Sequence, residues 1–440
     1  MESMILLVLA IAIPCCYGYW RSVSHGRVEI NHVTTFSLGF LYYWITPLAV
    51  RILAAHLVFP WSRVWLGLFR ERWIAPYALS CIALYLCFMI GDSLGARWWR
   101  SQRTEPAAPI PAIALSLCTA FGSLLLAYSV YAARADLFRP EGPGAIKADT
   151  ALGEITAPIM LLSCVALMFI LQRPEMPWRK LLLTRYFLPA LLGSGLVLFR
   201  GSRLYVASVV VMFAIYQTNF RARLKFKRMI AVGLLFGLFF GLVGTSRQGT
   251  SPAGVFANIL VEPMAISLSL AHHLRYKGIA WINQPTELID DLENLIPTVL
   301  LPNKYKLLKQ PDAWHPLGGL HSFVSFNLYF GLLGTAAFWF FMPLGFRYLR
   351  SRLFSTLFAT MYVMCSAWLI FSFFRNAFYL SLVKNIFEQS ILIPSVIAYF
   401  GWLLAAACSP VSTSRTANAT SSAPEGAGGE TPLSPSPSPS

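Results

Sequence analysis

Apolar runs of about 20 residues recur along almost the whole chain and are separated by short polar stretches. A helix needs about 20 apolar residues to cross a bilayer. We therefore predict an all-α fold, a polytopic transmembrane helical bundle of about eleven spans. The expected spans are, approximately, 3–20, 36–59, 74–95, 111–133, 154–172, 184–199, 203–219, 229–245, 320–345, 354–374 and 385–407.

The composition supports a membrane protein with a disordered end. Of the 440 residues, 56% are hydrophobic and 12% are charged, whereas soluble domains carry about 25% charged residues. Beyond residue 408 the sequence consists mainly of Ser, Thr, Pro, Gly and Ala, which cannot bury enough apolar surface to fold. We expect a transmembrane domain over 1–408 and a disordered tail over 409–440.

The formal net charge of +16 is concentrated in short loops between the apolar runs. This is the positive-inside pattern of membrane proteins, and we therefore predict no nucleic-acid binding. Four basic loops are expected to face the cytoplasm: 97–103, 173–180, 220–228 and 346–352. A fifth basic stretch, 61–73, falls on the outer side, where we expect an interfacial segment with tryptophan anchors or a misplaced second span.

In this topology the N-terminus is outside, the C-terminus is inside, and the longest outer loop covers about 246–319. Its apolar spacing predicts short amphipathic helices that lie at the membrane surface. Pro263 is expected to break or kink the first of these helices. Pro285 suits the first turn of the second helix, and Pro297 ends it.

The polar groups of the outer side indicate a site for a lipid diphosphate. An arginine near a bilayer is costly unless it is paired or solvated, and its guanidinium group matches phosphate oxygens. A histidine beside such a cluster suits a general base, and Asp312 is a carboxylate that neighbours two histidines in the sequence. The candidates are Arg200, Arg203, Arg247, Arg375, Asp312, His315 and His321.

Simpler roles remain open for the same side chains. Arg200 and Arg203 are also explained by snorkelling from a short turn toward lipid headgroups, and Arg247 by a role as a flanking anchor. His321 precedes an apolar run, so a helix-start side chain with a local hydrogen bond explains it equally well.

Other polar groups are expected to be structural. Asp92 is near the end of a span, where solvation at the interface is expected. His32 falls in a cytoplasmic loop and has no evident role. His272 and His273 are adjacent and face different sides of a helix, so they are poor metal ligands together. The eight cysteines lie in or beside apolar segments, so no disulfide framework or zinc site is predicted.

Four short motifs resemble the repeat-unit polymerases of O-antigen and capsule (Wzy-type) and the related O-antigen ligases. "LENLIPTVLLPNKYKLL" (292–308) is similar to a loop of the polymerases, and "GGLHSFVSFNLYFGLLG" (318–334) to the opening of the span that follows it. "RGSRLYVASVVV" (200–211) resembles a helix start shared with the ligases. "FFRNAFYLSLVKNI" (373–386) resembles a late arginine-containing turn, and the likeness covers roughly residues 190–400.

The resemblance implies a metal-independent membrane glycosyltransferase without a cofactor. It would transfer a growing glycan from undecaprenyl diphosphate onto another lipid-linked repeat unit, at the periplasmic face of a bacterial inner membrane. By this likeness Arg203 and Arg247 hold the diphosphate, Arg375 is a further phosphate or glycan contact, and His321 is a base or orients the acceptor. In the ligases an Asn usually follows the histidine, whereas Ser322 follows it here.

His315 and Asn376 lie on the same outer side and are candidate substrate contacts. The likeness also implies a co-polymerase that sets chain length as a protein partner. Three other classes stay open. An O-antigen ligase would use lipid A core as the acceptor, and a flippase for lipid-linked sugars would show paired repeats. A metal-dependent sugar transferase would need an acidic pair in an early outer loop, where the sequence offers only Glu71.

Overall fold

The computed structural model describes residues 2–54, 62–99, 109–132, 134, 149–199, 203–231, 233–235, 237–238, 255–283, 288, 320–376 and 378–408. At 149–154, 199, 203–204, 255–259 and 379, the backbone alone is described. The predicted tail and most of the predicted outer loop lie outside these residues.

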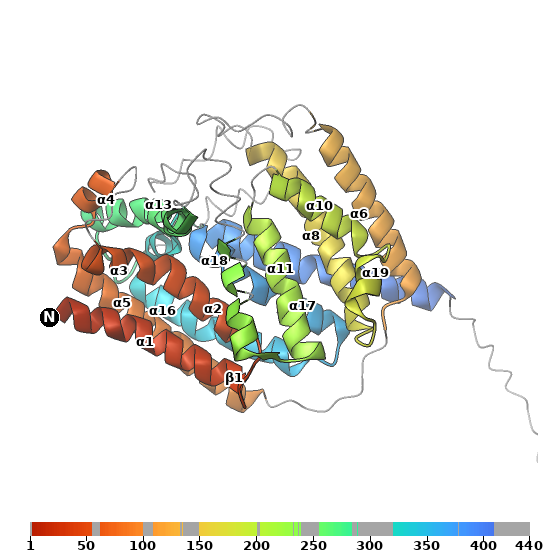
Figure 1. Cartoon of the computed structure of the whole chain (residues 1–440), viewed down its shortest axis with the longest axis horizontal. Coiled ribbons are helices and arrows are strands. Elements are labelled where there is room, and N and C mark those ends of the chain that lie inside the picture. The colour runs from red at the N-terminus through yellow and green to blue at the C-terminus, as the bar shows by residue number, and fades with distance from the viewer. Residues whose placement is uncertain are drawn as a thin grey trace, which may run out of the picture.

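The described chain is mainly helical, as predicted (Figure 1). The first half contains α1 (Glu2–Ser22), β1 (Val23–Ser24), β2 (Arg27–Val28), α2 (His32–Phe40), the π-helix η1 (Leu41–Ile45), α3 (Thr46–Leu53), α4 (Ser62–Leu68), the 3₁₀ turn η2 (Glu71–Trp73), α5 (Ile74–Trp98), α6 (Ala112–Ala132), α8 (Asp149–Leu171), α9 (Trp178–Leu182), α10 (Leu188–Phe199) and α11 (Arg203–Tyr216). The second half contains the π-helix η4 (Gln217–Arg221), β3 (Leu224–Lys225), α13 (Val255–Tyr276), α16 (Ser322–Ser351), α17 (Thr356–Trp368), α18 (Ser372–Arg375), the π-helix η6 (Tyr379–Leu392) and α19 (Ile393–Cys408).

Within the described residues, six helices are long and apolar enough to cross a membrane. They are Glu2–Ser22, His32–Leu53, Glu71–Trp98, Ala112–Ala132, Ser322–Ser351 and Leu380–Cys408. Shorter apolar helices cover Ile155–Leu171, Leu188–Leu198 and Thr356–Trp368. The chain is therefore an all-α membrane protein by the length and composition of its helices.

One group of helices, α1, α2, α5 and α16, forms a tightly packed bundle (Figure 1). Helices α5 and α16 lie against each other along their length, and two glycines of α5 face α16. A Cβ atom at Gly91 would lie 2.0 Å from the carbonyl oxygen of Phe340, and one at Gly95 would lie 2.9 Å from Arg347. Small residues of this kind let two membrane helices approach closely.

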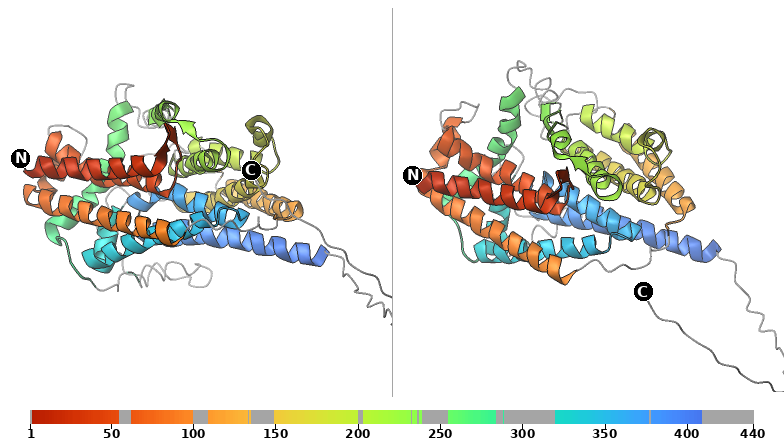
Figure 2. Two further views of the ribbon diagram at one scale, coloured as in Figure 1. Left: turned by 90° about the horizontal axis from the view of Figure 1, so that it is seen from below. Right: turned by 60° about the horizontal axis from the view of Figure 1, so that its bottom comes forward.

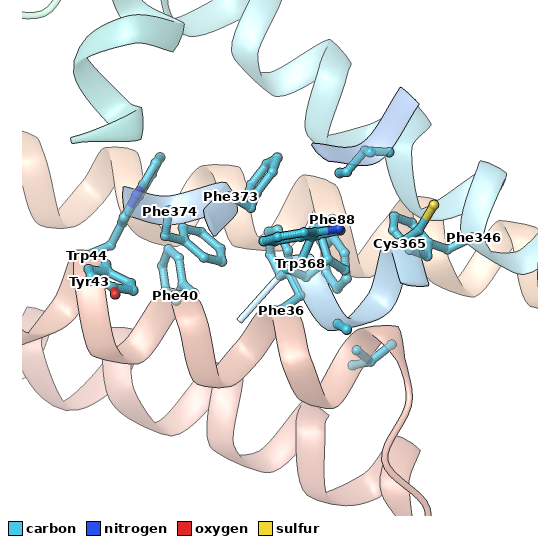
Figure 3. Close-up of a cluster of buried hydrophobic side chains, with 14 of the residues drawn as sticks. Phe36, Phe40, Tyr43, Trp44, Phe88, Phe346, Cys365, Trp368, Phe373 and Phe374 are labelled. Atoms are coloured by element: carbon cyan, nitrogen blue, oxygen red, sulfur yellow. The ribbon is translucent and has the colours of Figure 1, made fainter. Parts of the chain in front are cut away.

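Aromatic side chains fill the interior of this bundle (Figure 3). The rings of Phe36 and Phe88 stack with centroids 3.9 Å apart. Trp44 lies 4.7 Å from Trp339 and contacts Phe374 edge-on. Because aromatic pairs gain free energy beyond the burial of their area, this cluster fixes α2 and η1 against α16 and α18.

The second group, α6, α8, α10, α11, α17 and α19, lies beside the first (Figure 1). Close approach of α6 to α8 occurs at Gly122, and α10 approaches α8 at Gly193 beside Ile159. The break between α10 and α11 falls at the predicted interruption between the sixth and seventh apolar runs, where residues 200–202 are outside the described chain.

The predicted basic loops gather at one end of the structure. A small antiparallel sheet of order β1–β2–β3 joins the end of α1 to the segment after η4. Glu29 accepts a hydrogen bond from Arg223 over 2.9 Å and is also bound by Arg350. The loops 220–228 and 346–352 therefore meet at one carboxylate, which offsets part of their mutual repulsion.

The other two basic loops lie at the same end. Arg221 donates from Nε to the carbonyl of Pro174 over 2.9 Å, which places loop 173–180 there. Trp99 contacts Tyr348 edge-on, with ring centroids 5.1 Å apart, at the start of loop 97–103. The fifth basic stretch, 61–73, contains α4 and η2. Helix α4 packs against α13, at the end of the structure opposite the four basic loops.

The structure corrects the interpretation of Asp92 and His32, which are both fully buried. Asp92 accepts hydrogen bonds from Tyr17 over 2.6 Å and from Nη2 of Arg347 over 2.7 Å. It also lies 2.9 Å from Nε2 of His32 and 3.1 Å from Nε of Arg21. Helix α5 continues beyond Asp92, so this carboxylate joins four helices instead of being solvated at an interface.

Helix α13 also differs from its prediction. It runs through Pro263 without a break and packs against η1, α3, α4 and α16. Met264, Leu268 and Leu274 are buried. In both views of Figure 2, α13 runs across the direction of α1 and α5. It is therefore longer and more closely packed than the predicted short helix, and its direction across α1 and α5 agrees with the predicted position at the membrane surface.

Candidate functional site

Four segments meet at the end of the bundle opposite the basic loops: η1, α13, the start of α16, and α18. Tyr43 connects them, because its carbonyl and its hydroxyl have different partners. The hydroxyl donates to Oε1 of Glu262 over 3.1 Å, and the carbonyl oxygen lies 3.1 Å from Nε2 of His321. Glu262 in turn lies 3.4 Å from Nε of Arg375.

His321 occupies the N-cap position of α16. Its Nδ1 accepts a hydrogen bond from the amide of Phe323 over 3.3 Å, so the proton is on Nε2 and is donated to Tyr43. Its backbone amide donates to Oγ of Ser269 over 3.0 Å. Both ring nitrogens are thus bound by the backbone. This is the helix-start role that the sequence allowed as an alternative.

The burial of His321 determines its charge. The side chain is 0% exposed, and burial lowers the pKa of His321, which immediately precedes the span, to about 3. The ring is therefore neutral at physiological pH but has no unbound nitrogen in this conformation. A role as a general base requires Nδ1 to leave the amide of Phe323, and it stays a prediction.

Glu262 and Arg375 form the accessible part of this cluster. Their side chains are 35% and 32% exposed. Arg375 is the last residue of α18, and Glu262 lies in α13 directly before Pro263. An ion pair with this exposure is screened by solvent and holds its partners weakly. An anionic ligand can therefore compete with Glu262 for the guanidinium group.

Asn376 is bound within its own turn. Its Nδ2 donates to Oγ of Ser372 over 3.0 Å, and its backbone amide donates to the carbonyl of Ser372 over 3.1 Å. The same hydroxyl of Ser372 accepts from Nδ2 of Asn385 over 2.5 Å. Asn376 therefore shapes the turn that presents Arg375, and its predicted contact with a substrate stays a prediction.

The other predicted site residues lie at the edge of the described chain or outside it. Arg200, Arg247, Asp312 and His315 are outside the described residues. Arg203 begins α11, and only its backbone is described. The predicted convergence of four arginines therefore stays a prediction, and of the four side chains the structure describes that of Arg375, at the same end as His321.

A second buried histidine joins α13 to α16. Nε2 of His273 lies 3.1 Å from Oδ1 of Asn327, which also accepts from the amide of Ala280 over 3.1 Å. Burial lowers the pKa of His273 to about 4. Its role is to hold α13 in place. In the described chain, no group of three or more His, Cys, Asp or Glu side chains is arranged to hold a metal ion.

Sequence reasoning missed Glu262 and Tyr43. The available signal was an acidic residue within an otherwise apolar run, directly before a proline, in "NILVEPMAIS". An acid placed in an apolar helix needs a partner. The sequence did not show that this partner is Arg375, 113 residues further along the chain.

Comparisons of the chain with protein-family models, with curated proteins and with solved structures find no match in any of the three. The proposed function therefore rests on the residues of the site and their geometry.

Proposed function

We propose that the protein is a membrane glycosyltransferase that polymerises oligosaccharide repeat units carried on undecaprenyl diphosphate. It acts at the periplasmic face of a bacterial inner membrane, in the predicted topology of about eleven spans. Arg200, Arg203, Arg247 and Arg375 bind the diphosphate of the donor. A co-polymerase that sets chain length is the expected protein partner.

The observation that carries this proposal is the position of Arg375. It is an accessible arginine at the end of the structure opposite the basic loops, paired with a carboxylate that an anion can replace. If the basic loops are cytoplasmic, as the positive-inside rule requires, Arg375 faces the periplasm. A fork of N–H donors at that surface suits the diphosphate of a lipid-linked sugar.

The transfer reaction needs few other groups from the protein. The anomeric carbon of a sugar diphosphate is already activated, and the diphosphate leaves as an anion without protonation. Catalysis needs positive charge fixed at the leaving group, which is often the largest contribution to rate, and a base for the acceptor hydroxyl. The proposed mechanism uses no metal ion.

The direct test uses the purified full chain in detergent with a synthetic undecaprenyl-diphosphate repeat unit, in the presence of EDTA. The proposal predicts a ladder of polymerised products on a gel. Variants Arg203→Ala, Arg247→Ala and Arg375→Ala should lose the ladder. Full retention in all three would remove the diphosphate-binding mechanism.

Activity as an O-antigen ligase is distinguished by a gene deletion. Loss of a polymerase leaves lipopolysaccharide that carries a single repeat unit, whereas loss of a ligase leaves core without any O-chain. Purified protein that joins a glycan to lipid A core, and forms no ladder, would likewise assign the ligase activity.

Transport of a lipid-linked sugar is a second candidate, favoured by two features of the structure. Helix α16 is interrupted at Gly331, which has φ 64° and ψ −175°. Gln389 of η6 is 1% exposed, and neither of its amide atoms has a hydrogen-bond partner among the described residues. Interrupted helices and buried polar groups line substrate pathways in transporters. Movement of a fluorescent lipid-linked sugar across proteoliposomes, without polymerisation, would favour this function.

A further inference from the structure

The carboxylate of Glu262 is held in position by two groups of different chemistry. The buried Tyr43 hydroxyl donates to Oε1 over 3.1 Å, and Nε of Arg375 lies 3.4 Å from the same oxygen. Tyr43 is 1% exposed and is bound to His321 through its carbonyl. The tyrosine therefore has a fixed place, and it aims one oxygen of Glu262 toward the accessible guanidinium group.

A second acidic residue at the same end gives a contrast. Glu71 pairs with Arg51 over 3.5 Å, but the Glu71 side chain is 84% exposed. Exposed pairs of this kind contribute little to stability or to a site. Glu262 differs because it is 35% exposed and has a hydrogen bond from a buried group.

From this arrangement we infer that Glu262 is the general base of the transfer reaction, an inference that rests on the proposed function. The diphosphate of the donor and the carboxylate of Glu262 compete for Arg375. When the diphosphate binds the guanidinium group, Glu262 keeps its hydrogen bond from Tyr43 and loses its ion pair. The carboxylate is then beside the leaving group and can accept a proton from the acceptor.

The step balances without a further reactant. The acceptor is a sugar hydroxyl of a second lipid-linked unit, and its oxygen forms a bond to the anomeric carbon of the donor glycan. The bond from that carbon to the diphosphate oxygen breaks, and its electron pair leaves with the diphosphate. The hydroxyl proton passes to the carboxylate of Glu262, which later releases it to water.

The experiment compares Glu262→Gln with Glu71→Gln in the purified full chain. We measure the initial rate of ladder formation and the binding of the undecaprenyl-diphosphate repeat unit. Glu262→Gln is expected to lose at least about 100-fold in rate, the usual contribution of a general base, while binding stays as tight as in wild type or tightens, because the competing carboxylate is gone. Glu71→Gln should remain within about twofold of wild type in both, because exposed ion pairs contribute little.

A second variant separates chemistry from folding. In Glu262→Ala, added formate can occupy the vacated space and accept the proton, so formate should restore part of the lost rate. Formate should leave Arg375→Ala unchanged, because that variant lacks charge at the leaving group and keeps its base.

The outcomes are distinguishable. A wild-type rate in Glu262→Gln overturns the general base and leaves the polymerase proposal intact. Loss of binding together with rate, and no rescue by formate, makes Glu262 a positioning residue and also overturns the inference. Absence of any ladder from the wild-type protein overturns both the proposed function and this inference.

Discussion

The ring of His321 donates from Nε2 to the backbone carbonyl of Tyr43 over 3.1 Å, across 278 residues of sequence. This bond fixes the start of α16 against the π-helix η1. It also fixes the tyrosine whose hydroxyl binds Glu262. His321 thus helps to position Glu262, because it holds the backbone of Tyr43.

Replacing His321 should therefore affect folding before it affects chemistry. His321→Ala removes an N-cap and leaves the Phe323 amide and the Tyr43 carbonyl without their partner, which should cost about 2 kcal/mol or more of unfolding free energy. His321→Asn can keep the cap and should lose roughly half of that. Thermal unfolding in detergent, followed by tryptophan fluorescence, measures both. If His321→Ala melts like wild type, the cap contributes nothing. If His321→Asn folds but is inactive, the ring has a chemical role.

The buried histidines also predict how stability depends on pH. Burial lowers the pKa of His321 to about 3 and that of His273 to about 4, while an unfolded histidine titrates near 6.5. As the pH falls below about 6.5, the unfolded chain takes up protons that the folded chain does not, so stability is lost. Each histidine contributes a slope approaching about 1.4 kcal/mol per pH unit until its folded pKa is reached.

The measurement is the melting temperature between pH 7.5 and 4.5. We expect a steady fall for wild type and a flatter dependence for His273→Asn. His25 is exposed in the turn between β1 and β2, and His25→Asn serves as the control for a histidine substitution outside the packed helices. An equal slope in all three proteins would contradict the prediction.

Much of the architecture was predictable because it depends on local patterns. Apolar length predicts the six described helices that are long and apolar enough to cross a membrane, whereas the count of about eleven spans stays a prediction. The basic loops that the sequence placed on one side do gather at one end of the structure. The break between α10 and α11 coincides with "RGSR", whose two arginines and glycine interrupt the apolar run.

What the sequence did not reveal are the partners of isolated polar residues. Asp92 has its partners in three other helices, at positions up to 255 residues away. In the sequence, a carboxylate near a basic loop indicates a position at the membrane–water interface. Buried among two arginines, a histidine and a tyrosine, it becomes part of a network. The pair of Glu262 and Arg375 escaped prediction for the same reason, since pairing between distant helices leaves no local periodicity.

Gly331 should be intolerant of substitution. It has φ 64°, and a Cβ atom there would lie 2.7 Å from Cα of Ile282 and 2.7 Å from the carbonyl oxygen of Trp281. Gly331→Ala should cost at least about 1–2 kcal/mol for the positive φ alone. Gly345, in the same helix, has nothing within 4 Å of its Cβ position. Gly345→Ala should be neutral or stabilising by up to about 1 kcal/mol. The comparison is made by thermal unfolding, and equal loss in both variants would contradict it.

Asp92 should be essential for the stability of the bundle. Asp92→Asn keeps the size of the side chain but leaves Arg347 and Arg21 with an uncompensated buried charge, which should cost about 3–5 kcal/mol. The variant is expected to express poorly or to melt well below wild type. Glu71→Gln, which removes one partner of an exposed ion pair, serves as the control and should melt within a few degrees of wild type. A wild-type melting temperature for Asp92→Asn would show that the network contributes no net stability.

Arg375 tests whether the site requires a planar fork or only a positive charge. Arg375→Lys keeps the charge beside Glu262 but loses the paired N–H donors that match two phosphate oxygens. If the ligand is a diphosphate, its affinity should fall by about tenfold or more, since the loss of one charge-assisted hydrogen bond is worth roughly 1.5–3 kcal/mol. Arg51→Lys is the control, because Arg51 also pairs with a carboxylate, that of the exposed Glu71. The measurement is displacement of a fluorescent undecaprenyl diphosphate in detergent, at two salt concentrations.

Affinity that falls equally in both variants would point to a general effect of surface charge. A selective fall in Arg375→Lys that persists at high salt would identify bidentate recognition at this position, because exposed charge effects are screened whereas directed hydrogen bonds are not.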